Sequence, residues 1–200
     1  MSTHAMLDTV YMSGEVQPLR VRLIDCGREL LDEGGIDAVG LRSVARHAGV
    51  SHGAPRRYFP THKALLAAIA ASGFAELSAE LRTAIASETD PVARLRQIAY
   101  RYLSFARTHR TLFELMFRHD LLEGSGEDLR QHSKPLFETV AALAADAGAA
   151  DPHVVALNLW TQLHGVATLR ATRSIEVIAS DIDADGFVAQ LIDLHLKARG

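Results

Sequence analysis

The stretch LRSVARHAGVSHGAPRRYFPTHKALL, residues 41–66, decides the fold of this chain and carries its strongest functional signal. Its pattern predicts two short helices around a tight turn, and no Asp or Glu occurs between Asp37 and Glu76. The whole chain is nevertheless acidic, with a formal net charge of -3. A basic, helix-sized surface in an acidic protein suits docking on a polyanion, so we predict a helix-turn-helix that binds double-stranded DNA. The basic and histidine side chains of this region are Arg42, Arg46, Arg56, Arg57 and Lys63, with His47, His52 and His62.

Composition and charge indicate a helical protein with two unlike parts. The chain has 200 residues, 48% of them hydrophobic, which is ample for a sizeable core. Alanine and leucine are abundant and the alternation typical of strands is hard to find, so we predict an all-α fold. Residues 1–75 carry eight basic and seven acidic side chains, whereas residues 76–200 carry thirteen and seventeen. This asymmetry predicts a head that faces nucleic acid and an acidic body that repels phosphate.

Capping residues, prolines and glycines predict where the helices begin and end. Gly49 allows the left-handed backbone that a tight turn between two helices needs. Asp90-Pro91 and Asp151-Pro152 are each a cap followed by proline in the first helical turn. The expected helices run from Pro18 to Gly34 and Gly35, then over 41–48, 52–59, a long fourth helix from Thr61 into the eighties, 91–107, 112–119, 126–147, 152–172 and 186–198.

These elements divide the chain into three parts. We expect a flexible N-terminal arm at 1–17, a helix-turn-helix head at 18–64, and an effector-binding and dimerisation body at 65–200. The boundary falls within the long fourth helix, so head and body share one continuous element.

The predicted DNA contacts follow from the position of the second helix of the pair. Its first residues, His52, Gly53 and Ala54, would lie nearest base edges in a major groove. Arg56 and Arg57 can reach phosphates or a guanine edge. The start of the following helix favours a phosphate through its free amide groups and the helix dipole. The full set of expected DNA-binding residues is Arg42, Ser43, Ser51, His52, Gly53, Ala54, Pro55, Arg56, Arg57, Tyr58, Thr61, His62 and Lys63.

This region contains Ala48-Gly49-Val50-Ser51, Gly53, Phe59, Pro60 and Leu65. With these residues it resembles the tetracycline-repressor (TetR) family of one-component regulators. The chain departs from the family pattern at Gly40, where a capping threonine or serine is usual. Arg56, Tyr58 and His62 stand where tyrosine, histidine and lysine are usual, but each retains hydrogen-bonding ability, so the resemblance still implies docking on DNA.

The resemblance implies that the body forms a homodimer through its last two long helices and encloses an effector pocket. The sequence supports the dimer through apolar stripes on the helices expected at 154–172 and 187–198, and Gly165 allows close approach. The run WTQLHG, residues 160–165, resembles the tryptophan-histidine-glycine signature of one TetR-type ligand domain.

A pocket for an apolar or aromatic effector needs aromatic and flexible side chains with few polar anchors. The body offers seven such side chains, and two histidines as polar groups. Aromatic residues at helical spacing are more often ordinary core, and His164 is more often a satisfied core histidine, so both interpretations stay open. The expected ligand-binding residues are Tyr102, Phe105, His109, Phe113, Met116, Phe117, Phe137, Trp160 and His164.

Other motifs carry weaker signals. Asp181, Asp183 and Asp185 copy the opening of a calcium-binding EF-hand loop, but the twelfth position is Ile192 in place of glutamate. Neither the ten histidines nor the single Cys26 form a metal-binding or reactive pattern, and no catalytic triad or phosphate loop stands out. We therefore expect no metal, no cofactor and no enzymatic activity. Without a signal peptide or an uncharged stretch of bilayer length, we expect a cytoplasmic protein with no membrane contact.

Together these patterns predict a dimeric, all-helical repressor that a small molecule releases from its DNA operator. Two alternatives stay open. A protein of the same fold could activate transcription or bind DNA without an effector. Alternatively, the chain could be a helical small-molecule-binding or catalytic protein in which the basic hairpin binds no DNA. A steep loss of affinity for duplex DNA with rising salt would exclude this second alternative.

Overall fold

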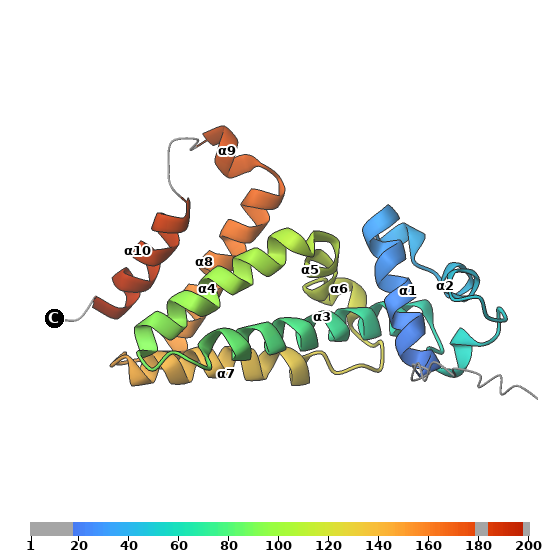
Figure 1. Cartoon of the computed structure of the whole chain (residues 1–200), viewed down its shortest axis with the longest axis horizontal. Helices are drawn as coiled ribbons and strands as arrows, with labels where there is room; N and C mark the ends of the chain where they lie inside the picture. The colour runs from blue at the N-terminus through green and yellow to red at the C-terminus, as the bar shows by residue number, and fades with distance from the viewer. Residues whose placement is uncertain (1–17, 179–183, 198–200) are drawn as a thin grey trace, which may run out of the picture.

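The computed structural model describes residues 18–178 and 184–197, and within these ranges it contains helices and no strand. The all-α fold predicted from the sequence is confirmed (Figure 1). The expected arm at 1–17 and the acidic residues Asp181 and Asp183 lie outside the described residues. The helices are α1 (Leu19–Gly34), α2 (Leu41–His47), α3 (His62–Ile85), α4 (Pro91–Thr108), α5 (Arg110–Met116), α6 (His119–Leu122), α7 (Arg130–Asp146), α8 (Pro152–Ala171), α9 (Ser174–Ile178) and α10 (Ala184–Lys197), and 3₁₀ turns cover Ile36–Ala38 and Pro55–Arg57.

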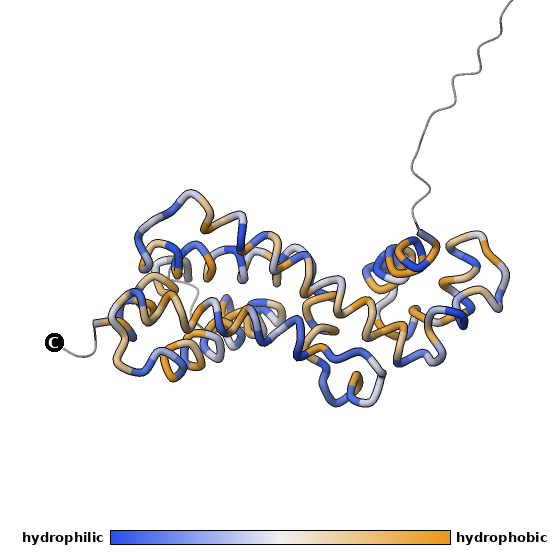
Figure 2. The backbone as a smooth tube through the Cα atoms, turned by 90° about the horizontal axis from the view of Figure 1, so that it is seen from below, coloured by the Kyte–Doolittle hydropathy of each residue, from blue (hydrophilic) through white to orange (hydrophobic). Residues whose placement is uncertain are grey.

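One long helix joins the two ends of the molecule. Figure 1 shows α1 and α2 at one end, and α4, α7, α8 and α10 toward the other. The 24 residues of α3 run between them without a break. α3 packs against α1 at the head end and against α4, α5, α6 and α7 in the body. Figure 2 shows apolar and polar residues alternating along the helices, as expected of elements with one buried face.

The central position of α3 explains its unusual composition. By length and composition α3 is the one helix in the described ranges that could cross a membrane, with a mean hydropathy of 1.4 over its most apolar window. The sequence predicts no such segment, because no uncharged stretch of the chain reaches the length of a bilayer, and α3 contains charged residues. In the structure 61% of that window is buried within the protein. Neighbouring helices, rather than lipid, cover these apolar side chains.

Three helix starts predicted from capping residues are confirmed, whereas the start predicted at Ser51 is wrong, because no α-helix follows it. Thr61 Oγ1 accepts a hydrogen bond from the Ala64 N–H at 3.0 Å. Asp90 and Asp151 each accept one from the amide three residues ahead, at 2.8 and 3.3 Å, and each precedes a proline in the first turn. These bonds satisfy amide groups that have no partner inside the helix, which fixes where α3, α4 and α8 begin.

The turn after α2 also forms as predicted. Gly49 adopts a φ of 67°, and the Val50 N–H donates to the Ala45 carbonyl at 2.9 Å, which closes the end of the helix. Gly40, before α2, has no side chain to offer as a cap. Ser43 supplies one instead, because its Oγ accepts a hydrogen bond from the Gly40 N–H at 2.8 Å.

The helix predicted at 52–59 is wrong. The structure has a single 3₁₀ turn there, Pro55–Arg57, with turns before it. Pro55 has no N–H to donate, and Gly53 loses more conformational freedom in a helix than other residues do. Most main-chain hydrogen bonds in this stretch therefore join residues three positions apart. We call residues 51–58 the recognition loop.

Three body helices also differ from the prediction. The helix expected at 112–119 is two helices, α5 and α6, and the chain between them turns at Arg118, whose guanidinium binds Asp120 through two hydrogen bonds of 2.9 Å. The helix expected from residue 126 begins only at Arg130, because Gly126 has a φ of 89°, outside the helical region. The short helix α9 has no counterpart in the prediction.

Candidate nucleic-acid interface and ligand cavity

The recognition loop presents unpaired cations on the outside of the head. Arg56 and Arg57 are exposed there, and Arg42 is exposed at the start of α2. Their guanidinium groups form no hydrogen bond or ion pair with any residue that the structure describes. Such side chains can reach a phosphate without first breaking an internal contact.

Twelve of the thirteen expected DNA-binding residues fall into two groups. Pro55 is buried and Ala54 is half-buried, so both pack the loop against the head. Ser43 and Thr61 cap helices, and His62 Nε2 lies 2.6 Å from the Val39 carbonyl oxygen. The residues of the second group are exposed, and their side chains form no hydrogen bond with the described residues. They are Arg42, Ser51, His52, Gly53, Arg56, Arg57 and Tyr58.

Lys63, the last of the thirteen, points toward the body. Its Nζ donates a hydrogen bond to the Glu123 carbonyl oxygen at 2.8 Å. Beside this contact, Arg20 pairs with Glu127 at 3.1 Å and stacks over the Phe59 ring at 5.7 Å. Residues 119–130, here called the α6–α7 segment, therefore touch the head at two points.

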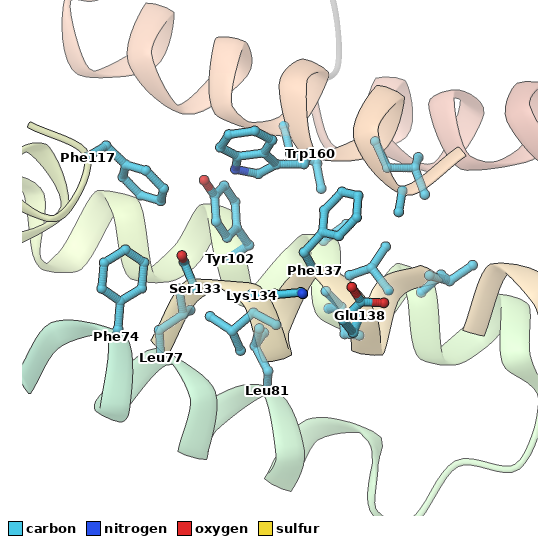
Figure 3. Close-up of a pocket in the computed structure, with 18 of the residues that line it drawn as sticks. Phe74, Leu77, Leu81, Tyr102, Phe117, Ser133, Lys134, Phe137, Glu138 and Trp160 are labelled. Atoms are coloured by element: carbon cyan, nitrogen blue, oxygen red, sulfur yellow. The ribbon is translucent and has the colours of Figure 1, made fainter. Parts of the chain in front are cut away.

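A cavity of about 370 Å³ lies in the body, between α3, α4, α7, α8 and α10 (Figure 3). Most of its wall is aliphatic or aromatic. A few polar side chains, from α6 and α7, complete the wall. The lining residues are Phe74, Leu77, Leu81, Leu95, Ile98, Ala99, Tyr102, Phe117, His119, Arg130, Ser133, Lys134, Leu136, Phe137, Glu138, Val140, Ala156, Leu159, Trp160, Leu163 and Ile192.

Four of the nine expected ligand-binding residues line this cavity: Tyr102, Phe117, Phe137 and Trp160. The other five occupy three kinds of place. Phe113 and His164 pack directly against Phe117, with ring centroids 5.0 and 4.5 Å away. Phe105 and Met116 are fully buried in the core, and His109 lies beside Glu76, 3.7 Å from its carboxylate.

A hydrogen bond joins the cavity wall to the side chains behind it. Tyr102 Oη lies 3.0 Å from His164 Nδ1. Burial raises the pKa of Tyr102 and lowers the pKa of His164 from its ordinary value of 6.5. Both groups are therefore neutral near pH 7, and this part of the wall carries no charge.

Several lining residues were not expected from the sequence. Phe74, Leu77 and Leu81 lie on α3, where a continuous apolar run looks like ordinary core. Arg130 and Lys134 lie one turn apart on α7, and only that i, i+4 spacing could have indicated that they share a face. Their position beside an apolar cavity depends on how α7 packs, which local sequence does not determine.

Two clusters of potential metal ligands also form: Cys26, Glu29 and His47, and Glu76, Glu80 and His109. No metal site was expected from the sequence. In the first cluster Glu29 pairs with His47 at 2.7 Å, and burial raises the pKa of Cys26, which disfavours the thiolate that a metal needs. In the second, Arg28 pairs with Glu76 at 2.5 Å. Ion pairing already accounts for both arrangements.

Two family profiles match the chain. The profile for bacterial regulatory proteins of the tetR family matches residues 23–69, and the profile for the tetracyclin repressor-like C-terminal domain matches residues 95–194. The first range holds the recognition loop and the second holds most of the cavity wall. No curated protein matches the chain.

Solved structures share the fold over nearly the whole chain. A protein of unknown function from Rhodococcus sp. RHA1 is 30% identical, with a TM-score of 0.79 over 94% of this chain and 98% of that one. The fatty acid degradation regulator FadR from Bacillus halodurans is 16% identical, with a TM-score of 0.70 over 90% and 95%. A TetR-like transcriptional regulator from Rhodococcus sp. RHA1 is 20% identical, with a TM-score of 0.68 over 90% and 96%.

Proposed function

We propose that this chain, which belongs to the TetR family of transcriptional regulators, is a dimeric repressor that leaves its DNA operator when a small molecule fills the body cavity. The observation that carries the proposal is the pairing of exposed, unpaired arginines on the recognition loop with an apolar cavity at the other end of α3. The division into a head at 18–64 and a body at 65–200 is part of the proposal.

The recognition loop and the start of α2 supply the DNA contacts. Arg42, Arg56 and Arg57 would bind phosphates or a guanine edge, and His52 and Gly53 would approach base edges. Two heads related by a two-fold axis would occupy half-sites about one helical turn or slightly more apart.

The cavity is suited to a small, mostly apolar effector. Its volume of about 370 Å³ lies at the lower end of the range for ligand pockets, roughly 300–1,000 Å³. The ligand must bind the arrangement that releases DNA more tightly than the arrangement that binds DNA, and DNA must in turn weaken ligand binding.

The α6–α7 segment offers a route between the two sites. His119 and Arg130, at its two ends, line the cavity, while Glu123 and Glu127 hold the head residues Lys63 and Arg20. A ligand that moves this segment would disturb both head contacts. If Lys63 leaves the Glu123 carbonyl to bind a DNA phosphate, one of the two head contacts of this segment is lost.

The homodimer would form through α8 and α10. Val154, Leu157 and Leu169 on α8 are about half exposed, at 50, 47 and 47%, and Leu194 on α10 is 63% exposed. A side chain at Gly165 would meet open space. A second copy of the chain would cover these apolar faces in a four-helix interface. The proposed role places the protein in the cytoplasm and includes no catalysis.

Salt dependence of duplex binding tests the proposal. Log affinity should fall linearly with log salt, with a slope of about 0.9 per phosphate contact, and Arg57→Ala should reduce that slope by about one contact. Fluorescence anisotropy with a labelled duplex measures both quantities. The matched control is Arg101→Ala, because Arg101 is also exposed but lies on α4 of the body. An unchanged slope in Arg57→Ala would contradict the proposed contact surface.

A further inference from the structure

The cavity is elongated along the helices that enclose it. Phe74, Leu77 and Leu81 span seven residues of α3, which is about 10 Å at the rise of an α-helix. Arg130 and Val140 span about 15 Å of α7. Figure 3 shows the side chains of α3, α7 and α8 following one another along this direction. A narrow, extended space of this kind fits a linear molecule better than a compact one.

One end of the cavity is lined mainly by apolar side chains. Around it lie Leu81, Leu95, Val140, Ala156 and Ile192, none of which has a polar side-chain atom. A charged or hydrogen-bonding part of a ligand placed there would lose its water and gain no partner. The polar part of any ligand must therefore lie elsewhere along the cavity.

The opposite end, toward α6, carries positive charge. The lining there includes His119 and Arg130, and Lys134 follows one turn further along α7. Figure 3 shows Ser133 and Lys134 on α7 beside the cavity. Arg130 and Lys134 are exposed, and neither forms an ion pair or hydrogen bond through its side chain in the ranges the structure describes. Their position at the edge of the cavity leaves both charges hydrated, so an anion can be bound without burying an isolated cation.

The one carboxylate that lines the cavity does not cancel this charge. Glu138 lies on α7, one turn beyond Lys134, and its Oε2 is 3.2 Å from His153 Nε2. That contact directs its carboxylate to α8. The formal charge of the lining residues remains positive, because Arg130 and Lys134 outnumber Glu138.

We propose that the effector is a linear amphiphile with a single anionic end group, whose apolar chain fills the cavity and whose anion is bound by Arg130 and Lys134 at the α6 end. The inference rests on the proposed function, because it names the ligand class of the same cavity. The anion can be a free carboxylate, or the phosphates of a carrier to which the chain is linked as a thioester. Both sources place negative charge beside the two cations.

The single tryptophan of the chain makes the test direct. Trp160 lines the cavity, so its fluorescence reports occupancy without a label. Decanoate, decan-1-ol and decylamine are titrated below their micelle concentrations, since they share a chain length and differ in end-group charge. Decanoate should bind about tenfold more tightly than decan-1-ol, and decylamine most weakly. Decanoyl-coenzyme A, titrated in parallel, distinguishes a free carboxylate from a phosphorylated carrier.

Two variants localise the preference. Arg130→Met and Lys134→Met should each reduce the ratio of decanoate to decan-1-ol affinity and leave decan-1-ol binding unchanged. Arg101→Met, on the outside of α4, should leave the ratio as in the wild type. Far-ultraviolet circular dichroism confirms that each variant is folded.

The outcomes separate this inference from the proposed function. Equal binding of decanoate and decan-1-ol, an unchanged ratio in both variants, or no response of Trp160 to any of the four probes would overturn the ligand class. Duplex binding is measured on the same samples. A protein that binds duplex DNA but shows no preference for the anion would keep the proposed DNA-binding role and lose only this inference.

Discussion

At the scale of single residues, Ser43 illustrates how a side chain expected to bind DNA serves the head itself. Its Oγ accepts a hydrogen bond from the Gly40 N–H and donates to the Ala38 carbonyl at 2.8 Å. Residue 40 is glycine, so Ser43 is the side chain that satisfies the start of α2. The departure of Gly40 from the family pattern is thus compensated three residues later.

Ser43→Ala should therefore lower stability and leave the salt dependence of DNA binding unchanged. Loss of a helix-capping side chain costs about 1 kcal/mol. Thermal unfolding measures the first effect and anisotropy with labelled duplex the second. Ser51→Ala, on the exposed recognition loop, is the matched control and should be nearly neutral for stability. A reduced salt slope in Ser43→Ala, without a loss of stability, would contradict this role.

The burial of His164 should make the stability of the fold depend on pH. Burial lowers its pKa from 6.5, so the unfolded chain binds this proton more readily than the folded chain. Stability should fall as the pH falls from 6.5 through the lower folded-state pKa, and the contribution should vanish at higher pH. His164→Gln should flatten the change in melting temperature between about pH 7.5 and about pH 5.5.

The control for this titration is His52→Gln, because His52 is exposed and has no ionic partner in the described ranges. It should retain the wild-type pH dependence. If the melting temperature changes equally with pH in the wild type and in His164→Gln, the Tyr102–His164 pair does not cause the pH dependence of stability.

The sequence predicted which cationic side chains the head carries, but not where each side chain points. The sequence showed an acid-free run of cations, yet His62 packs on the Val39 carbonyl and Lys63 binds the body. Which way a side chain points depends on packing between elements far apart in the chain. The Glu123 carbonyl that binds Lys63 is 60 residues away, beyond any local pattern.

At the scale of elements, helix ends were predictable where a side chain or a glycine determines them. Thr61, Asp90 and Asp151 each form the expected cap, and Gly49 turns the chain after α2. The helix predicted at 52–59 did not form because Pro55 and Gly53 weaken helical hydrogen bonding. Cavity residues on α3 were missed because an apolar helix face looks the same whether it contacts side chains or a void.

The exposed face of α8 makes its own prediction. Leu157→Arg should convert the proposed dimer to a monomer, because a charge would replace an apolar side chain that a second copy is expected to cover. Leu157 is 47% exposed, so the substitution should not disturb the fold of a single chain. Size-exclusion chromatography with light scattering measures the mass.

Thr83→Arg is the control for this experiment, since Thr83 is exposed on α3, outside the α8 and α10 faces. It should keep the wild-type mass. A wild-type protein that is monomeric at every concentration would refute the proposed interface.

At the scale of the whole molecule, the α6–α7 segment contacts the head and also lines the cavity. Lys63 and Arg20 bind this segment in the structure, at 2.8 and 3.1 Å. If Lys63 transfers to a phosphate when DNA binds, the segment loses one of its two head contacts. The cavity end lined by His119 and Arg130 would then become less ordered.

Amide hydrogen exchange can detect this change. Exchange within residues 119–130 should rise when a saturating duplex is added, and exchange in α8 should stay constant. In Lys63→Ala the segment should exchange faster in the free protein, with no further increase upon DNA binding. Protection of the segment by DNA in the wild type would contradict the proposed route.

The unbroken length of α3 has a mechanical consequence. A helix of 24 residues is about 36 Å long, so a tilt of about 5° at its body end displaces its head end by about 3 Å. In a two-fold pair these displacements add, and the spacing of the two recognition loops would change by about 6 Å. With amplification of this kind, a ligand could shift the cavity wall by less than a bond length. Both heads would then no longer fit neighbouring grooves of the DNA.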